Sequence, residues 1–77
     1  MTRVEIEYCV PCGLRDRAVT LQNDLLDLFG QQLTLVSLRP GDGGVFRVRV
    51  DGETVFDKET DAYDSEAIAA AVRERVS

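Results

Sequence analysis

Apolar residues change their spacing near residue 9, and this change constrains the fold more than any other feature of the chain. Over residues 2–8, apolar and charged side chains alternate, which predicts a β-strand with one buried face. From residue 13 onward, apolar residues recur every three or four positions, which predicts an α-helix over about 12–29 that ends at Gly30. The expected inner stripe of this helix comprises Leu14, Ala18, Leu21, Leu25 and Leu28, widened by Leu26 and Phe29.

The middle of the chain predicts three further strands. Clustered apolar residues predict a strand over 32–38, and the proline and glycines of 39–44 predict a loop. Apolar residues and arginines alternate over 46–50, the pair Asp51-Gly52 suits a tight turn, and 54–56 supply the returning strand. This segment is therefore expected to form a β-hairpin.

A second helix is expected over about 65–76, because helix-capping residues at 61–65 precede an alanine-rich segment. Its inner side is expected to carry Ile68, Val72, Arg75 and Val76.

The order β-α-β-β-β-α predicts an α/β two-layer sandwich with a four-stranded mixed sheet, formed as a single domain over residues 1–77. The first helix is a crossover connection, so the strands on either side of it should be parallel. Because charges alternate with apolar residues in the first and third strands, both helices should cover one face of the sheet. The other face should carry Arg3, Glu5, Glu7, Arg47 and Arg49.

Cys9 and Cys12 are the only cysteines, and they lie three positions apart where the first strand gives way to the first helix. Cys9 is expected to end the strand and Cys12 to lie in the first helical turn, where Pro11 is well tolerated. A helix N-terminus favours a thiolate over a thiol. A disulfide across so short a loop removes little chain entropy, so a structural role is not required. We therefore interpret Cys9 and Cys12 as redox-active catalytic residues that need no organic cofactor.

Charge and hydropathy exclude other classes of partner. The net charge of −5 and an isoelectric point near 4.5 argue against nucleic-acid binding, which needs a basic surface. No segment approaches the roughly 18 consecutive apolar residues of a membrane span. Residues 1–3 lead into a strand pattern and not into the apolar region of a signal peptide, so a cytoplasmic location is expected.

Two alternatives to redox chemistry remain open. Two thiolates are half of a structural zinc site, and the chain has no histidine, so zinc would have to be shared between two chains. The protein is otherwise a non-enzymatic adaptor that binds another protein through the polar sheet face or the outer strand of the hairpin, with the cysteines as a redox-sensitive contact.

Two motifs resemble the selenoprotein W-like, or Rdx, family of the thioredoxin-like fold. Val4-x-Ile6-x-Tyr8-Cys9-x-x-Cys12 is similar to its opening strand and redox turn, and Gly44-Val45-Phe46-x-Val48-x-Val50-Asp51-Gly52 is similar to its Gly-x-Phe-x-Val strand and hairpin. The resemblance implies a small oxidoreductase-like protein whose partners are glutathione or protein thiols. Cys12 matches the selenocysteine of the selenoprotein members, so the resemblance implies that Cys12 is the reactive thiolate and Cys9 its resolving partner.

The chain departs from the family pattern at three places. Leu14 stands where many bacterial members have tryptophan, and residues 61–64 replace a Gly-Arg-Phe-Pro-like segment with an acidic one. Gly43-Gly44 stands where thioredoxins place a cis-proline. If the 61–64 segment docks a partner, its acidic sequence implies a partner different from those of other members. The missing cis-proline argues against thioredoxin-like turnover on generic substrates.

Overall fold

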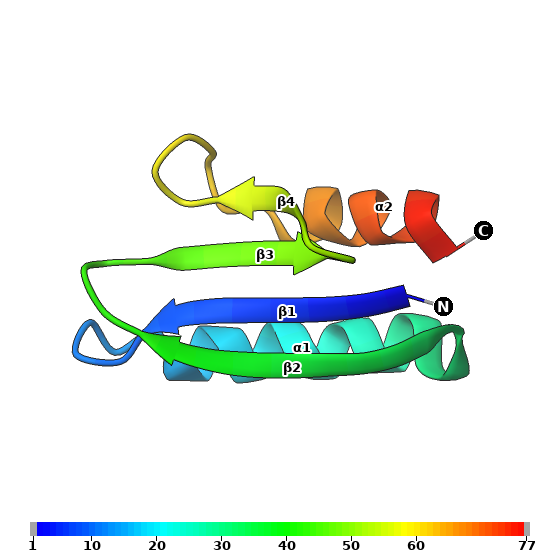
Figure 1. Ribbon diagram of the computed structural model, residues 1–77, viewed down its shortest axis with the longest axis horizontal. Helices are drawn as coiled ribbons and strands as arrows, with labels where there is room; N and C mark the ends of the chain where they lie inside the picture. The colour runs from blue at the N-terminus through cyan, green and yellow to red at the C-terminus, as the bar shows by residue number, and fades with distance from the viewer. Residues whose placement is uncertain (1, 77) are drawn as a thin grey trace.

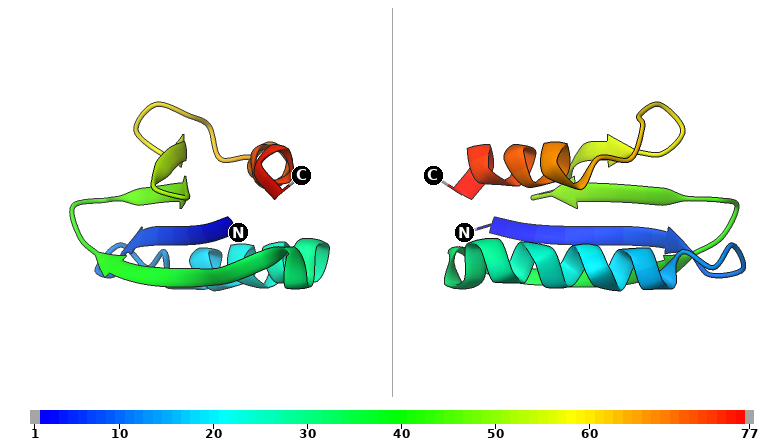
Figure 2. Two further views of the ribbon diagram at one scale, coloured as in Figure 1. Left: turned by 45° about the vertical axis from the view of Figure 1, so that its right-hand side comes forward. Right: turned by 180° about the vertical axis from the view of Figure 1, so that it is seen from behind.

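The computed structural model describes residues 2–76 and has two layers, a four-stranded sheet and a pair of helices (Figure 1). Seen from behind, both helices lie in front of the sheet and run in the same direction (Figure 2). This confirms the predicted element order and the placement of both helices on one face. The elements are β1 (Thr2–Cys9), α1 (Arg15–Phe29), a 3₁₀ turn η1 (Gly30–Gln32), β2 (Leu33–Gly41), β3 (Phe46–Val50), β4 (Glu53–Asp57) and α2 (Ser65–Val76).

The strand order is β2-β1-β3-β4, so β1 is a central strand. β1 pairs in parallel with β2, as the crossover through α1 requires, and antiparallel with β3. β3 and β4 form the expected antiparallel hairpin. Cys9 is the last residue of β1, so the chain leaves the sheet there between β2 and β3.

The core lies between the sheet and the helices. Apolar side chains from the inner faces of β1 and β3 pack there against the apolar stripe of α1. This agrees with the spacing of apolar residues in the sequence. Fully buried residues include Val4, Ile6, Ala18, Leu25, Phe46, Val48 and Val72.

The inner stripe of α1 is narrower than the sequence suggests. Leu26 and Leu28 were expected to face the core, but they are 42% and 57% exposed. Leu26 follows buried Leu25 by one position, and each residue turns about 100° around the helix, so its side chain points away from the sheet. Leu28 lies on the flank of α1 toward α2 and borders a groove between the two helices.

The second strand is longer than predicted. Residues 39–41 were expected in a loop, but they extend β2 to Gly41. β2 is an edge strand, where a proline such as Pro40 is tolerated because one side of the strand needs no hydrogen-bond donor. A register shift opposite Thr2 and Arg3 leaves Thr34 without a partner, so Leu33 and Val36 both face the core.

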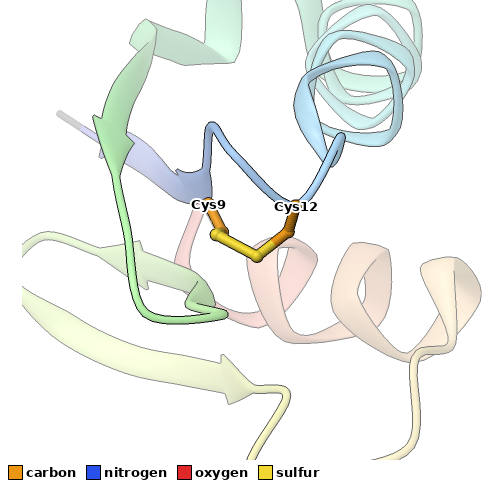
Figure 3. Close-up of a disulfide and its surroundings, with 2 residues drawn as sticks. All are labelled: Cys9 and Cys12. Atoms are coloured by element: carbon orange, nitrogen blue, oxygen red, sulfur yellow. A yellow bond between two sulfur atoms is a disulfide. The ribbon is translucent and has the colours of Figure 1, made fainter.

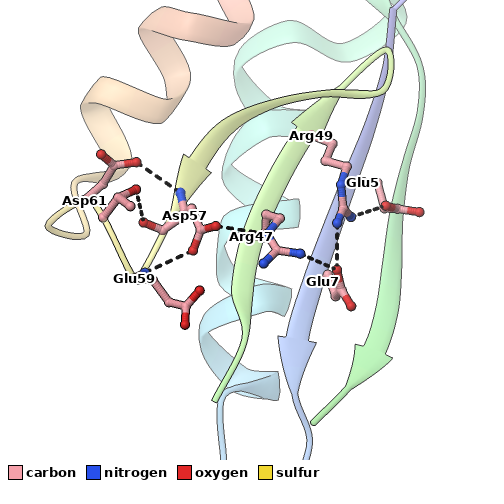
Figure 4. A network of polar contacts seen from close by, with 8 residues as sticks. Glu5, Glu7, Arg47, Arg49, Asp57, Glu59 and Asp61 are labelled. Atoms are coloured by element: carbon pink, nitrogen blue, oxygen red, sulfur yellow. Dashed lines mark hydrogen bonds and ion pairs between the residues drawn. The ribbon is translucent and has the colours of Figure 1, made fainter. Parts of the chain in front are cut away.

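The uncovered face of the sheet carries a network of ion pairs (Figure 4). Arg49 donates to Glu5 at 2.7 Å and to Glu7 at 3.0 Å, and Arg47 lies 3.6 Å from Glu7. Arg47 also donates to Asp57 of β4 at 3.1 Å. Burial disfavours the charge of Arg49, but hydrogen bonds to Glu7 and Glu5 outweigh it and raise its pKa above the usual value. Four of the five residues expected on this face, Glu5, Glu7, Arg47 and Arg49, are thus paired with one another, and Arg47 extends the network to Asp57 of β4.

Within residues 2–76, no helix is both long enough and apolar enough to span a membrane.

Candidate redox site

A four-residue turn, residues 10–13, joins the end of β1 to α1. Cys9 ends the strand as predicted, but α1 begins at Arg15, so Cys12 lies in the turn and not in the first helical turn. The physical reason is Gly13, whose φ of +74° is left-handed and cannot continue a right-handed helix. The N–H of Gly13 donates to the carbonyl of Val10 at 3.1 Å, which closes the turn.

Cys9 and Cys12 are joined by a disulfide that connects the end of β1 to this turn (Figure 3). Their Cα atoms lie 5.3 Å apart, within the usual range for a disulfide. Cys9 has no exposed surface, whereas Cys12 is exposed. The two bonded cysteines therefore lie in different environments, one buried in the core and one at the surface.

The surface around Cys12 combines an apolar residue with charges. Val10 is 52% exposed, although it directly follows the buried Cys9. A shallow pocket is lined by Val10, Gly13, Arg15 and Asp16. The unpaired N–H groups at the start of α1 favour an anion here, and Asp16 in the first turn opposes them.

The N-terminus of α1 lies at the end of the sheet where β1 ends (Figure 1). α1 and α2 run in the same direction, so the N-terminal ends of both helices point toward the end of the sheet where β1 ends (Figure 2). Asp64 caps α2 by accepting the N–H groups of Glu66 at 3.0 Å and Ala67 at 3.3 Å. This confirms that residues 61–65 contain the helix cap.

Tyr63 makes a set of contacts that the sequence reasoning did not single out. Its ring contacts Phe46 and Phe56, with centroid distances of 5.6 and 5.7 Å, and the Arg17 guanidinium lies 4.6 Å from its centroid. Burial raises the pKa of Tyr63, nearby Arg17 opposes the shift, and Asp24 adds to it. These contacts join residues from three elements, so no local signal in the sequence identifies them.

Tyr8 lies in the core, and it pairs with Phe46 across β1 and β3. The alternation of residues 2–8 predicted this, because Tyr8 falls on the same strand face as Val4 and Ile6.

No cluster of three or more metal-ligating side chains occurs in the part of the chain that the structure describes. Cys9 and Cys12 are joined in a disulfide here, so in this state neither residue offers a thiolate that could bind a metal. The arrangement can open and close one disulfide bond between a buried cysteine and an exposed one.

The chain is similar to known proteins over nearly its whole length. A family model described as the Rdx family matches residues 3–74. A crystal structure of a Bordetella parapertussis protein is 34% identical, with 96% of each chain covered and a TM-score of 0.91. A crystal structure of a selenoprotein W-related protein from Vibrio cholerae is 26% identical, with 99% of this chain and 98% of the other covered and a TM-score of 0.90. No curated protein sequence matches significantly.

Proposed function

The chain belongs to the Rdx family, and from that membership we propose that it is a thiol–disulfide redox protein whose catalytic residues are Cys9 and Cys12. The membership confirms the resemblance noted in the sequence, and the two-layer β-α-β-β-β-α architecture is that of the thioredoxin-like fold. A redox-type role is supported by the family together with a cysteine pair at bonding distance. The observation that carries the finer proposal is the difference in exposure between the two cysteines.

In the proposed reaction, the exposed Cys12 is the residue that meets the substrate. Its thiolate attacks a substrate disulfide, forms a mixed disulfide and releases the first substrate thiolate. The Cys9 thiolate then attacks the Cys12 sulfur, releases the second substrate thiolate and closes the Cys9–Cys12 bond. Two electrons pass from the protein to the substrate, which is reduced to two thiols.

The exposure of Cys12 also supports the reverse reaction, in which an external thiol reduces the Cys9–Cys12 disulfide. An incoming thiolate attacks the Cys12 sulfur, because Cys9 has no exposed surface. Cys9 leaves as the thiolate. A second external thiolate then attacks the sulfur of the first, forms a disulfide with it and releases Cys12 as the thiolate. The reductant is oxidised to its disulfide, and both protein cysteines are restored.

We propose glutathione or a partner-protein thiol as the second reactant, in the cytoplasm. Cytosolic thiol pools keep most cysteine pairs reduced, and a Cys-x-x-Cys pair can use that pool as an electron source. Val10, exposed beside Cys12, offers such a partner an apolar contact next to the reacting sulfur.

Trapping of the mixed disulfide tests the proposal. Reduced Cys9→Ser protein is mixed with glutathione disulfide and analysed by intact-mass spectrometry under non-reducing conditions. We expect a stable glutathione adduct on Cys12, because the resolving thiol is absent, and we expect wild type to proceed to the internal disulfide. The absence of both products at native pH, in protein that circular dichroism shows to be folded, would sink the proposal.

The adaptor alternative has its own discriminating result. A Cys9→Ser, Cys12→Ser double variant that captures the same partners with the same affinity as wild type favours adaptor function. Loss of capture in the double variant, together with trapped partners on Cys9→Ser, favours thiol–disulfide exchange. Retention of zinc by the reduced protein, in a dimer that EDTA dissociates, would instead favour a zinc site shared between two chains.

A further inference from the structure

A groove of about 290 Å³ lies between α1 and α2, on the side of the molecule opposite the ion-paired sheet face. Its apolar lining comes from buried Leu21 and Leu25 of α1 and buried Ala69 of α2, with Leu28 at the border. Leu28 is 57% exposed, the largest exposure among the large apolar side chains of residues 2–76. The groove is thus floored by an apolar strip of mostly buried side chains, and Leu28 is the part of that strip that is open to solvent.

The rim of this groove is acidic. Asp24 and Asp27 line it from α1, and Glu66 and Ser65 line it from α2. Among the described residues that line the groove, none carries a positive charge. The rim is therefore a set of carboxylates on both sides of an apolar strip.

The nearest arginines are engaged with aromatic rings beyond the two ends of the groove. Arg17 stacks on Tyr63, which precedes the N-terminus of α2, with its guanidinium carbon 4.6 Å from the ring centroid. Arg73 stacks on Phe29 at the C-terminus of α1, at 5.6 Å. One pair lies at the N-terminal ends of the helices and the other at their C-terminal ends. Neither arginine is among the residues that line the groove.

The charge pattern selects among possible occupants. A second copy of this chain would bring the same acidic rim and a net charge of −5 against it, which is repulsive. An anionic lipid surface would be repelled in the same way. A segment with apolar residues flanked by lysine or arginine would place its apolar side chains on Leu28 and its cations on the rim.

We propose that the groove between α1 and α2 binds a basic amphipathic helix of a partner protein. The apolar face of that helix packs between Leu21, Leu28 and Ala69. Its basic residues pair with Asp24 and Asp27 on one side and with Glu66 on the other. The inference uses neither cysteine, so it stands or falls independently of the redox function.

A designed peptide tests the proposal. The probe is a fluorescein-labelled amphipathic helical peptide with a leucine stripe flanked by lysines, and the comparison peptide has glutamate at every lysine position. Fluorescence anisotropy with the oxidised wild-type protein gives the affinities. We expect binding of the basic peptide that weakens with added salt, and no binding of the acidic one. Equal binding of both peptides would overturn the proposal, because simple apolar adhesion would then explain the result.

Matched variants locate the binding. The Asp24→Asn, Asp27→Asn double variant should bind the basic peptide with roughly three- to tenfold lower affinity, as expected for the loss of two exposed ion pairs. The Asp42→Asn, Glu59→Gln control removes the same net charge away from the groove and should leave the affinity close to wild type. An equal loss in both double variants would overturn the proposal in favour of general charge attraction.

Nuclear magnetic resonance gives the second readout. Amide shifts caused by the basic peptide should cluster on residues 21–28 and 65–69 and should vanish in Leu28→Ser, whose exposed position makes the change compatible with folding. Shifts confined to the sheet face would overturn the proposal. So would the same groove shifts arising from an increase in protein concentration alone, because the occupant would then be a second copy of the chain.

Discussion

The backbone N–H of Val10 donates a hydrogen bond of 3.0 Å to the carbonyl of Gly41, so the turn that carries Cys12 is attached to the end of β2. The N–H of Leu14 also returns to the carbonyl of Cys9 at 3.3 Å. The turn is thereby tied to the sheet at one side and to the end of its own strand at the other. These bonds hold the turn so that the exposed Cys12 stays within bonding distance of the buried Cys9.

This arrangement predicts unequal reactivity of the two thiols. In the reduced protein, Cys12 should be alkylated by iodoacetamide faster than Cys9 by on the order of tenfold or more, because only exposed thiolates react readily. Peptide mapping by mass spectrometry at short reaction times measures the ratio. In urea-unfolded protein the difference should disappear, and a native ratio near unity would contradict the prediction.

Gly13 predicts a conformational requirement in the redox turn. Its φ is +74°, and a Cβ atom added there would meet no atom within 4 Å, so the cost of a side chain is purely one of backbone strain. Gly13→Ala should lower the free energy of unfolding by about 1 kcal/mol, measured by urea denaturation. Gly13→Asn should cost less, because asparagine tolerates the left-handed conformation. Equal costs for the two variants would show that strain is not the cause.

The ion pairs of the sheet face predict a contrast between two arginines that share Glu5. Arg49 donates to Glu5 and Glu7 at 2.7 and 3.0 Å, whereas Arg39 lies 3.8 Å from Glu5 with 62% of its side chain exposed. Arg49→Ala should lower the free energy of unfolding by roughly 1 kcal/mol at low salt and less at high salt, and Arg39→Ala should have almost no effect. Urea denaturation at two salt concentrations makes the comparison. Similar losses for both variants would refute it.

Asp57 predicts a dependence of stability on pH. The backbone N–H of Glu59 donates to its carboxylate, and this bond lowers its pKa below 3.8; partial desolvation opposes the shift, and Arg47 reinforces it. A lowered pKa in the folded state means that the carboxylate stabilises the fold above its ordinary pKa and stops doing so as the pH falls through the lower value. The stability difference between wild type and Asp57→Asn should therefore shrink as the pH falls below 3.8. A difference that stays constant over that range would contradict the assignment.

Most of the architecture was predictable because the apolar spacing of β1, β3 and α1 is regular. The errors arose where the same residue types are compatible with two kinds of secondary structure. Leu14 has the spacing of the α1 stripe and Pro11 is typical of a helix start, so the helix was predicted to begin at residue 12, but the left-handed Gly13 delays it to Arg15. Pro40 and Gly41 are typical of loops, but an edge strand tolerates both.

The candidate site was predictable only in part. The spacing of Cys9 and Cys12 correctly predicted a pair at bonding distance at the end of the first strand. Their unequal burial was not predictable, because it depends on how helices and strands distant in sequence cover the end of β1. The contact between Arg17 and Tyr63 joins residues 46 positions apart, and no local pattern indicates such a contact.

The central position of β1 has a consequence for how the molecule fluctuates. The amides of β1 belong to ladders with neighbours on both sides, so their exchange with deuterium should be among the slowest in the protein. The turn at 10–13 has only the few bonds described above and should exchange quickly. One covalent bond thus links a slowly exchanging strand to a faster exchanging turn. Once that bond is reduced, the turn that carries Cys12 can open and reclose while the strand that holds Cys9 stays folded.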